Sequence, residues 1–215
     1  MKIVIYLYYF FRSVFLRGLY NTIQLLRAEQ VNERFFGIKT SRIKKSNSKE
    51  FFHYQGASYK VLFRIFSEIK DINNLEFVDI GSGKGRAVFM AEYNGFNYVS
   101  GIEMDEVLVS DSKNNVARYL KKRKESQIAF IQSNALDYEY KNAPSVYFLF
   151  NPFNEEILKK VLDRILSSTF AETWFIYMNP LYSEAFRREG IELVRTFKTR
   201  FYTEALLFKI KGKTE

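Results

Sequence analysis

Residues 77–86 read FVDIGSGKGR and decide the fold class of this chain. An apolar strand pattern runs directly into a loop with glycine at three alternate positions, and a helical pattern follows from Arg86 to Tyr93. Glycine is needed where the backbone turns sharply, or where a ligand must approach the main chain without an intervening side chain. The following helix presents free N–H groups and the positive end of its dipole, which suit a carboxylate or a phosphate. The segment therefore predicts a strand–loop–helix unit that binds an anionic ligand group.

A second motif lies at the end of the next predicted strand. About twenty residues after Gly83, this strand ends in an acidic residue, Glu103, which at such a spacing accepts hydrogen bonds from both hydroxyls of a ribose. The two motifs together predict a nucleoside-containing cofactor. The dinucleotide fingerprint G-x-G-x-x-G does not fit, because its third glycine falls on Arg86 or Val88. A phosphate loop ending in G-K-[ST] is also absent, since Lys84 is followed by glycine.

Strand and helix patterns alternate along most of the chain. Apolar runs typical of strands lie at 76–80, 98–103, 128–132, 146–150 and 174–178, and two further strands joined by a turn lie at 191–197 and 203–210. Helical periodicity is found at 59–69, 86–93, 107–122 and 155–166. This order predicts an α/β fold: a Rossmann-like, doubly wound sheet of about seven strands with helices on both faces.

Composition narrows the classes of protein. The 215 residues are 47% hydrophobic and 27% charged, which is typical of a globular domain and excludes wholesale disorder. The absence of cysteine excludes a disulfide scaffold, a thiolate metal site and a cysteine nucleophile. The single histidine, His53, excludes a site that needs two imidazoles, and we expect no metal. A net charge of +9 is compatible with nucleic acid, an anionic membrane surface or an acidic partner.

The amino-terminal segment allows two interpretations. Apolar runs at 3–11 and 14–16 are interrupted by Arg12 and Arg17, and neither approaches the roughly 20 residues of a spanning helix. No small-residue cleavage site follows them, so we expect no signal peptide. The segment is either a helix that packs on the domain or on a second subunit, or an interfacial helix whose basic residues, Lys2 included, contact lipid phosphates. Residues 41–50 read as an exposed basic loop or linker, or alternatively as a basic lip that faces the substrate.

VDIGSGKGR followed by GIE resembles the first two motifs of the class I S-adenosylmethionine-dependent methyltransferases. The resemblance implies that Asp79 serves the methionine amino group and that Glu103 binds the ribose. Gly81 and Gly83 are implied to hold the methionine carboxylate through the backbone. The resemblance covers the chain from about Tyr54 to its carboxyl end, and it implies a sheet whose last strand is antiparallel. The cofactor expected from it is S-adenosylmethionine.

Further cofactor contacts are implied by the same resemblance. Ser82 and Gly85 belong to the glycine loop. After the third strand, an acidic or amide residue followed by a small one lines the adenine in this family, and Asn134 and Ala135 occupy those positions here. Asn134 replaces the more usual Asp. Tyr54 precedes the first domain helix, where similar enzymes fold a lid over the cofactor.

The fourth strand ends in FNPFN, residues 150–154. Asn151, Pro152 and Phe153 are similar to the Asn/Asp-Pro-Pro-Tyr/Phe motif of amino-directed methyltransferases, with one proline missing. They also resemble the Asn-Asn-Phe variant of the silencing-disruptor type of nucleosomal lysine methyltransferase. An Asn carbonyl can hold an amine N–H with the nitrogen lone pair toward the methyl group, and Phe153 can stack on the substrate. The alternative is that Asn151 caps the helix that begins near Glu155.

These observations predict a catalytic domain at 51–215 behind a helical and basic extension at 1–50. We expect a cytoplasmic methyltransferase that acts on an amine, with a protein lysine favoured. Attachment of the extension to an anionic membrane surface or to an acidic partner stays open beside packing on the domain. His53 as a general base and Asn179-Pro180 as pocket residues are weaker candidates. The alternatives are an RNA or small-molecule methyltransferase, an NAD-type oxidoreductase, and a non-catalytic scaffold that binds RNA or a membrane.

Overall fold

The computed structural model describes residues 2–41, 56–122 and 127–210, with the backbone alone for residues 2–6. Within these ranges the helices are α1 (Lys2–Arg17), α2 (Leu19–Phe36), α3 (Tyr59–Phe66), α4 (Arg86–Tyr93), α5 (Glu106–Leu120) and α6 (Glu155–Ser168), with short 3₁₀ turns η1 (Ile72–Asn74) and η2 (Ser183–Phe186). The strands are β1 (Glu76–Ile80), β2 (Tyr98–Glu103), β3 (Ile128–Gln132), β4 (Ser145–Leu149), β5 (Thr173–Met178), β6 (Ile191–Thr199) and β7 (Tyr202–Ile210).

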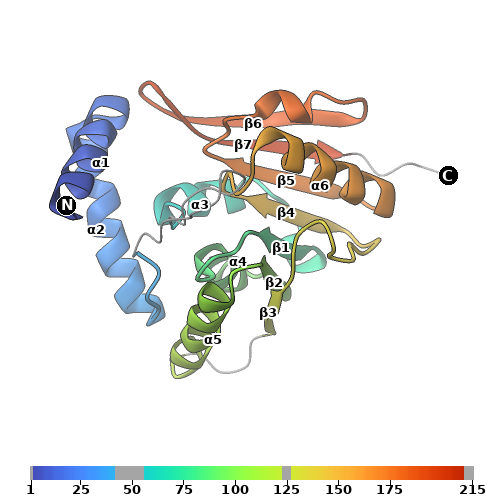
Figure 1. Cartoon of the computed structure of the whole chain (residues 1–215), viewed down its shortest axis with the longest axis horizontal. Helices are drawn as coiled ribbons and strands as arrows, with labels where there is room; N and C mark the ends of the chain where they lie inside the picture. Colours follow the sequence, from blue (N-terminus) through green and yellow to red (C-terminus); the bar gives the residue numbers. More distant parts are fainter. Residues whose placement is uncertain (1, 42–55, 123–126, 211–215) are drawn as a thin grey trace.

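The strands form one sheet in the order β3-β2-β1-β4-β5-β7-β6 (Figure 1). The first five pair in parallel, and β7 runs antiparallel to both of its neighbours, β5 and β6. The predicted seven-stranded, doubly wound sheet with an antiparallel last strand is confirmed. Because β1 and β4 are neighbours whose connections leave in opposite directions, the switch point of the sheet lies between them, where ligands bind in open α/β sheets.

The register brings the predicted site segments to one edge. Asp79 of β1 pairs with Gly101 of β2 on one side and with Phe148 of β4 on the other. The glycine loop, Glu103 and the segment that follows Leu149 therefore leave the sheet side by side, at the carboxyl ends of the parallel strands. We call this the carboxyl edge.

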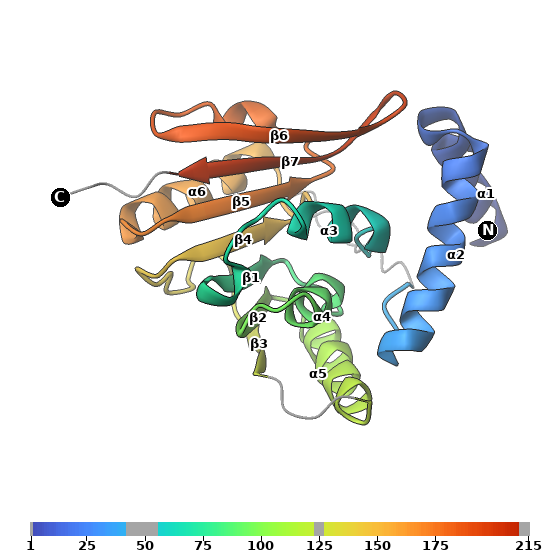
Figure 2. The same cartoon turned by 180° about the vertical axis from the view of Figure 1, so that it is seen from behind.

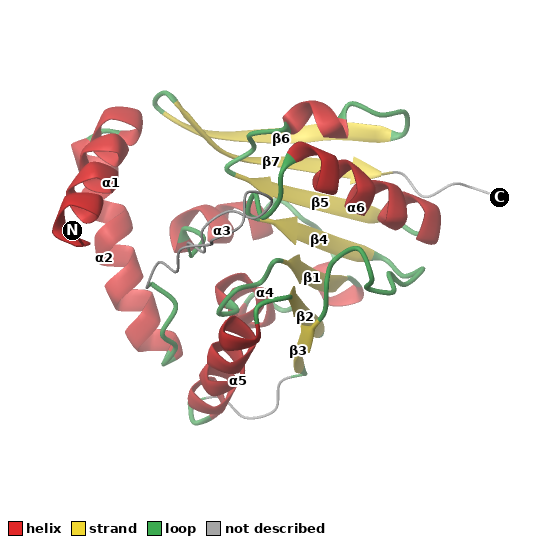
Figure 3. Ribbon diagram, viewed as in Figure 1, coloured by secondary structure: helices red, strands yellow, loops and turns green. Residues whose placement is uncertain are grey.

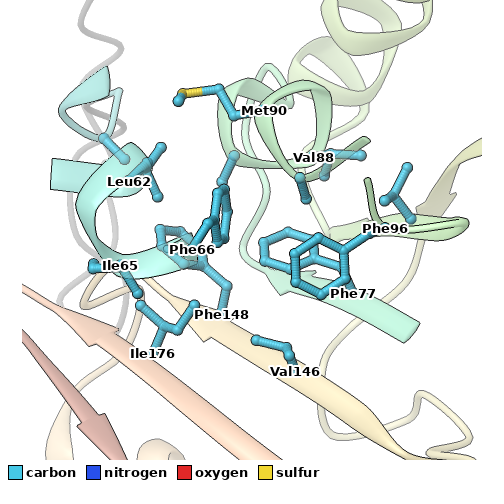
Figure 4. Packing of buried hydrophobic residues seen from close by; sticks show 14 of the residues in the cluster. Leu62, Ile65, Phe66, Phe77, Val88, Met90, Phe96, Val146, Phe148 and Ile176 are labelled. Carbon is cyan, nitrogen blue, oxygen red and sulfur yellow. The ribbon is translucent and has the colours of Figure 1, made fainter. Parts of the chain in front are cut away.

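Two apolar layers cover the sheet, as the alternation of side chains along a strand requires. On one face, residues of α3 and α4 such as Leu62, Phe66 and Val88 pack on Phe77 and Phe148 (Figure 4). On the other face, α6 and η2 pack on the intervening strand positions. Helices lie on both sides of the sheet, which is the arrangement that Figure 3 shows.

The amino-terminal segment forms two helices that meet at Gly18, which has a φ of 85°. They lie beyond the carboxyl ends of β4 and β5 in both views (Figures 1 and 2). Phe36, at the end of α2, is buried and stacks on Tyr59 and Tyr119, so this end of the pair belongs to the main core. In the described part of the chain, no helix is long and apolar enough to cross a membrane.

Candidate functional site

The glycine loop follows β1 with three left-handed glycines, Gly81, Gly83 and Gly85, at φ values of 78°, 54° and 86°. A Cβ atom on Gly81 would lie 2.7 Å from the Cβ of Pro152. Any other residue at position 81 would therefore combine a strained backbone with a collision. The glycine loop and the segment after β4 are in direct contact because this position has no side chain.

A second close approach joins the glycine loop to β2. A Cβ atom on Gly101 would lie 2.6 Å from both the Cβ and the Oγ of Ser82. The Oγ of Ser82 is buried and has no hydrogen-bond partner among the described residues. Buried hydroxyls are normally hydrogen-bonded, so this orphaned group is suited to a ligand.

The backbone donors of the loop have internal partners. The N–H groups of Gly81 and Ser82 both donate to the carbonyl oxygen of Ile102, at 2.9 Å. The N–H of Gly83 donates to Oε2 of Glu103, also at 2.9 Å. A carboxylate beside this loop would therefore use the Ser82 hydroxyl and the first-turn N–H groups of α4, which helix geometry leaves without intrahelical partners. The backbone role expected of Gly81 and Gly83 stays a prediction, and in this structure their N–H groups are used within the protein.

Glu103 is held at the end of β2. Its Oε1 accepts a hydrogen bond from the N–H of Asp105 at 2.9 Å, while its Oε2 is bound to Gly83. Burial raises the pKa of Glu103, and these backbone hydrogen bonds oppose the increase. A carboxylate has lone pairs for more than two donors, so both oxygens retain capacity for ribose hydroxyls.

Asp79 is the most unusual charged group of the edge. Its side chain is 3% exposed, and no hydrogen bond or ion pair joins it to another described residue. Burial raises its pKa well above the ordinary value, and the nearby charge of Glu103 adds to the increase. A buried carboxylate without a partner is costly in free energy. The site therefore suits a ligand that brings its own cation, such as an ammonium group.

The expected adenine segment lies next to Glu103. The N–H of Ser133 donates to the carbonyl oxygen of Glu103 at 3.1 Å, which fixes the start of the segment against β2. Oδ1 of Asn134 accepts from the N–H of Leu136 at 2.9 Å, and Ala135 is buried. The structure thus brings Asn134 and Ala135 to the same edge as the glycine loop, with the Asn side chain already forming a local turn.

Asn151 directly follows β4 and adopts a left-handed backbone conformation, with φ of 42°. Its side chain is buried, and Oδ1 accepts a hydrogen bond from the Tyr177 hydroxyl at 2.8 Å. Left-handed non-glycine residues store strain and are concentrated at functional sites. The residue that caps α6 is Asn154, whose side chain accepts from the N–H of Ile157. The capping alternative for Asn151 is therefore wrong.

The neighbours of Asn151 lie in different surroundings. Pro152 contacts the glycine loop at Gly81. Phe153 is buried, with 6% of its surface exposed, in the apolar layer beneath α6. Its predicted contact with a substrate stays a prediction. Asn179, after β5, repeats the Asn151 arrangement: its φ is 48°, and its Oδ1 accepts from the Tyr202 hydroxyl at 2.6 Å.

Two residues of the site were not found from the sequence. Tyr177 lies inside the uniformly buried strand β5, where a tyrosine cannot be told from a core residue. Arg86, the first residue of α4, is 2% exposed and donates to Glu29 at 2.7 Å and to Thr40 at 2.7 Å. A cation at a helix amino terminus opposes the helix dipole, and this was the available signal that Arg86 has tertiary partners.

Some expected residues cannot be placed. His53 and Tyr54 lie outside the described residues, as does most of the predicted basic loop at 41–50. Within the ranges that the structure describes, no group of three acidic or histidine side chains is arranged to hold a metal ion.

No protein-family model and no curated protein matches this chain. Solved structures do match it. One is yhhF from Escherichia coli, which is described as a methyltransferase. Its TM-score is 0.58, and it is 16% identical over 80% of this chain and 92% of its own. Magnesium protoporphyrin IX methyltransferase from Synechocystis, with bound S-adenosylmethionine, has a TM-score of 0.57 and 14% identity over 71% of this chain and 79% of its own.

A ribosomal protein L11 methylase from Lactobacillus delbrueckii is also similar, with a TM-score of 0.52 and 15% identity over 72% of this chain and 79% of its own. Likeness at such low identity shows the fold. This chain has the fold of the class I S-adenosylmethionine-dependent methyltransferases.

Proposed function

We propose that this protein is an S-adenosylmethionine-dependent methyltransferase that acts on a nitrogen atom. The observation that carries the proposal is Asp79: a buried carboxylate without a partner among the described residues, beside the glycine loop of a methyltransferase fold. S-adenosylmethionine has an ammonium group, a carboxylate and a ribose, and the edge has a matching group for each. Fold alone does not specify activity, so the proposal rests on this set of groups.

Each group has one task. Asp79 pairs with the ammonium group, and the Ser82 hydroxyl and the first turn of α4 hold the carboxylate. Glu103 accepts hydrogen bonds from the ribose hydroxyls. Asn134 and Ala135 line the adenine.

The acceptor side is organised by Asn151. Bound S-adenosylmethionine supplies a methyl group on a positively charged sulfur, and an uncharged nucleophile must reach it in line. Oδ1 of Asn151 has a second lone pair beyond the one that the Tyr177 hydroxyl uses, and this lone pair accepts an N–H of the acceptor amine. Tyr177 is then a positioning residue, because it orients the amide without contacting the amine.

The acceptor class is the finer part of the proposal. The order Asn151-Pro152-Phe153, similar to amino-directed and lysine-directed methyltransferases, favours an amine and in particular a protein lysine. Among the similar structures, one is named for a porphyrin and another for a ribosomal protein, so acceptors differ widely on this scaffold.

Labelled methyl transfer tests the proposal. The full chain is incubated with radiolabelled S-adenosylmethionine and separated protein, RNA, lipid and small-molecule fractions of a lysate. We expect label on a nitrogen atom, with the protein fraction labelled first. Label on oxygen or carbon would overturn the nitrogen assignment. No label in any fraction, despite binding of S-adenosylhomocysteine, would contradict the catalytic proposal.

A further inference from the structure

The outer surface of α1 and α2 is unusually apolar. Ten of the twenty exposed large hydrophobic side chains in the described part of the chain lie on these two helices. They are Leu7, Tyr8, Phe11, Phe15, Leu19, Tyr20, Ile23, Leu26, Val31 and Phe35. The helices contain only 16 and 18 residues, so the exposed apolar groups are concentrated rather than scattered. Concentrations of this kind mark interaction sites.

The charges of the helical pair are sorted by side. Both of its acidic residues face the domain: Glu29 binds Arg86 at 2.7 Å, and Glu33 accepts from Thr40 at 2.8 Å. Within residues 7–36, the exposed charged side chains are all cationic, namely Arg12, Arg27 and Arg34. The outward surface thus combines apolar groups with positive charge and carries no exposed acid.

The tip of the β6–β7 hairpin extends this surface. The N–H of Phe201 donates to the carbonyl oxygen of Leu16 at 3.1 Å, and the Phe201 ring lies 6.4 Å from that of Phe15. Phe201 is 70% exposed, and the guanidinium of Arg200 lies over its ring. Two segments far apart in the sequence therefore each contribute exposed aromatic rings and an arginine to this surface.

An open groove of about 580 Å³ lies on α1 within this surface. It is lined by Tyr8, Phe11, Arg12, Phe15 and Leu16. We call the outward side of α1 and α2, this groove and the hairpin tip together the aromatic–basic surface. Its lining offers apolar contact together with one arginine.

The charge pattern discriminates among partners. A second copy docked through the same surface would bring arginines together without an acid to neutralise them, which is unfavourable in a symmetric interface. A nucleic acid would neutralise the arginines but leave the leucine, isoleucine and valine side chains in water. An anionic lipid bilayer offers phosphates to the arginines and an apolar layer to the aromatic and aliphatic groups.

We propose that the aromatic–basic surface docks on an anionic lipid bilayer, with α1 and α2 lying in the interface. The pair is fixed to the domain by Arg86 and by the ion pair of Arg17 with Glu204 at 2.6 Å. Strands β4 and β5 point toward the pair (Figures 1 and 2), so docking turns the carboxyl edge toward the bilayer. The inference depends on no property of the cofactor site.

Vesicle co-sedimentation of the full chain tests this docking. Vesicles of phosphatidylcholine alone are compared with vesicles of phosphatidylcholine and phosphatidylglycerol in equal parts. We expect binding to the anionic vesicles, weakened about ten-fold or more by the double variant Phe11→Ser/Phe15→Ser. Phe170→Ser is the matched control, because Phe170 is 58% exposed and lies far along the chain from the surface. Both altered rings are exposed, so we expect the variant to fold.

A charge series separates the electrostatic contribution. Arg12→Gln/Arg27→Gln is expected to weaken binding to anionic vesicles about 30-fold and to reduce its dependence on salt, since two basic residues near such a surface together contribute about 2 kcal/mol. Arg187→Gln, at an 80% exposed arginine elsewhere, is expected to change neither.

Three outcomes would overturn the inference. The first is that the wild type does not bind anionic vesicles, and the second is that the double variant binds them as tightly as the wild type does. The third is that the wild type sediments as a dimer and that Phe11→Ser/Phe15→Ser dissociates it. The aromatic–basic surface would then be an interface between copies of the chain. Binding of S-adenosylhomocysteine, measured on each variant, reports separately on the proposed function.

Discussion

The two halves of the carboxyl edge differ in the residues that form them. The half formed by β1, β2 and β3 uses left-handed glycines, the buried carboxylate of Asp79 and the half-buried carboxylate of Glu103. The half formed by β4 and β5 uses left-handed asparagines, each with a tyrosine hydroxyl on its side-chain oxygen. Charge and backbone suit a cofactor of constant shape, whereas neutral amides suit the amine acceptor that we propose, because its nitrogen must be uncharged to accept the methyl group. The difference predicts that substitutions in one half change cofactor affinity and those in the other change turnover.

The largest effect is expected at Asn151. Asn151→Ala should lower turnover by about 100-fold or more, in the range measured for loss of one polar contact in a transition state, because the acceptor amine loses its hydrogen bond. Affinity for S-adenosylhomocysteine should stay unchanged. Asn154→Ala is the control: it removes the cap of α6 and should cost about 1 kcal/mol of stability without loss of turnover. Undiminished turnover in Asn151→Ala would contradict the proposal that the half formed by β4 and β5 acts on the acceptor.

Asp79→Asn should act on the other half. We expect affinity for S-adenosylhomocysteine to fall by about 100-fold, because the ammonium group loses a buried ionic partner worth about 3 kcal/mol. The ligand-free variant should be more stable than the wild type at neutral pH. Calorimetry and thermal unfolding measure the two effects, and a variant that binds like the wild type would contradict the assignment.

The pH dependence of Asp79 follows from its raised pKa. The unfolded chain releases this proton near the ordinary value of 3.8, before the folded protein does, so the ionised carboxylate lowers stability as pH rises between the two values. The stability difference between wild type and Asp79→Asn should therefore disappear below pH 3.8. Cofactor affinity has the opposite dependence: it should fall as the pH decreases through the raised pKa and the carboxylate is protonated.

Gly81→Ala should disturb both halves of the carboxyl edge, because the added Cβ would lie 2.7 Å from the Cβ of Pro152. We expect both affinity and turnover to fall about ten-fold, from the strain of a collision worth 1–3 kcal/mol. Gly190→Ala isolates the backbone contribution, since Gly190 has a φ of 80° and nothing within 4 Å of the added atom. Equal losses in the two variants would mean that the contact with Pro152 is unimportant.

The smallest effect is expected at Tyr177. Tyr177→Phe should lower turnover about five-fold with little change in cofactor affinity, since one neutral hydrogen bond contributes about 1 kcal/mol. Tyr119→Phe is the matched control, because it removes a buried hydroxyl bonded to Glu92, away from the carboxyl edge. Losses of equal size in both variants would indicate a structural role for Tyr177.

The arrangement of the half proposed to bind the cofactor was predictable from the sequence, and that of the half proposed to bind the acceptor only in part. Glycines with positive φ and a spaced acidic residue form a local pattern, so the loop at 81–85 and Glu103 were found by reading along the chain. The partner of Asn151 is set by the packing of β5 beside β4, which joins residues 26 positions apart. The same limit applies to Arg86, whose partners Glu29 and Thr40 lie in α2 and in the segment after it. Asn154, three residues after Asn151, was the better cap, and only the structure distinguished the two asparagines.

Calorimetric titration of the full chain with S-adenosylhomocysteine, and separately with NAD, tests the assignment of the carboxyl edge most directly. We predict one binding site for S-adenosylhomocysteine, weakened about 100-fold by Asp79→Asn, and no binding of the dinucleotide. Tight binding of NAD without binding of S-adenosylhomocysteine would contradict the assignment.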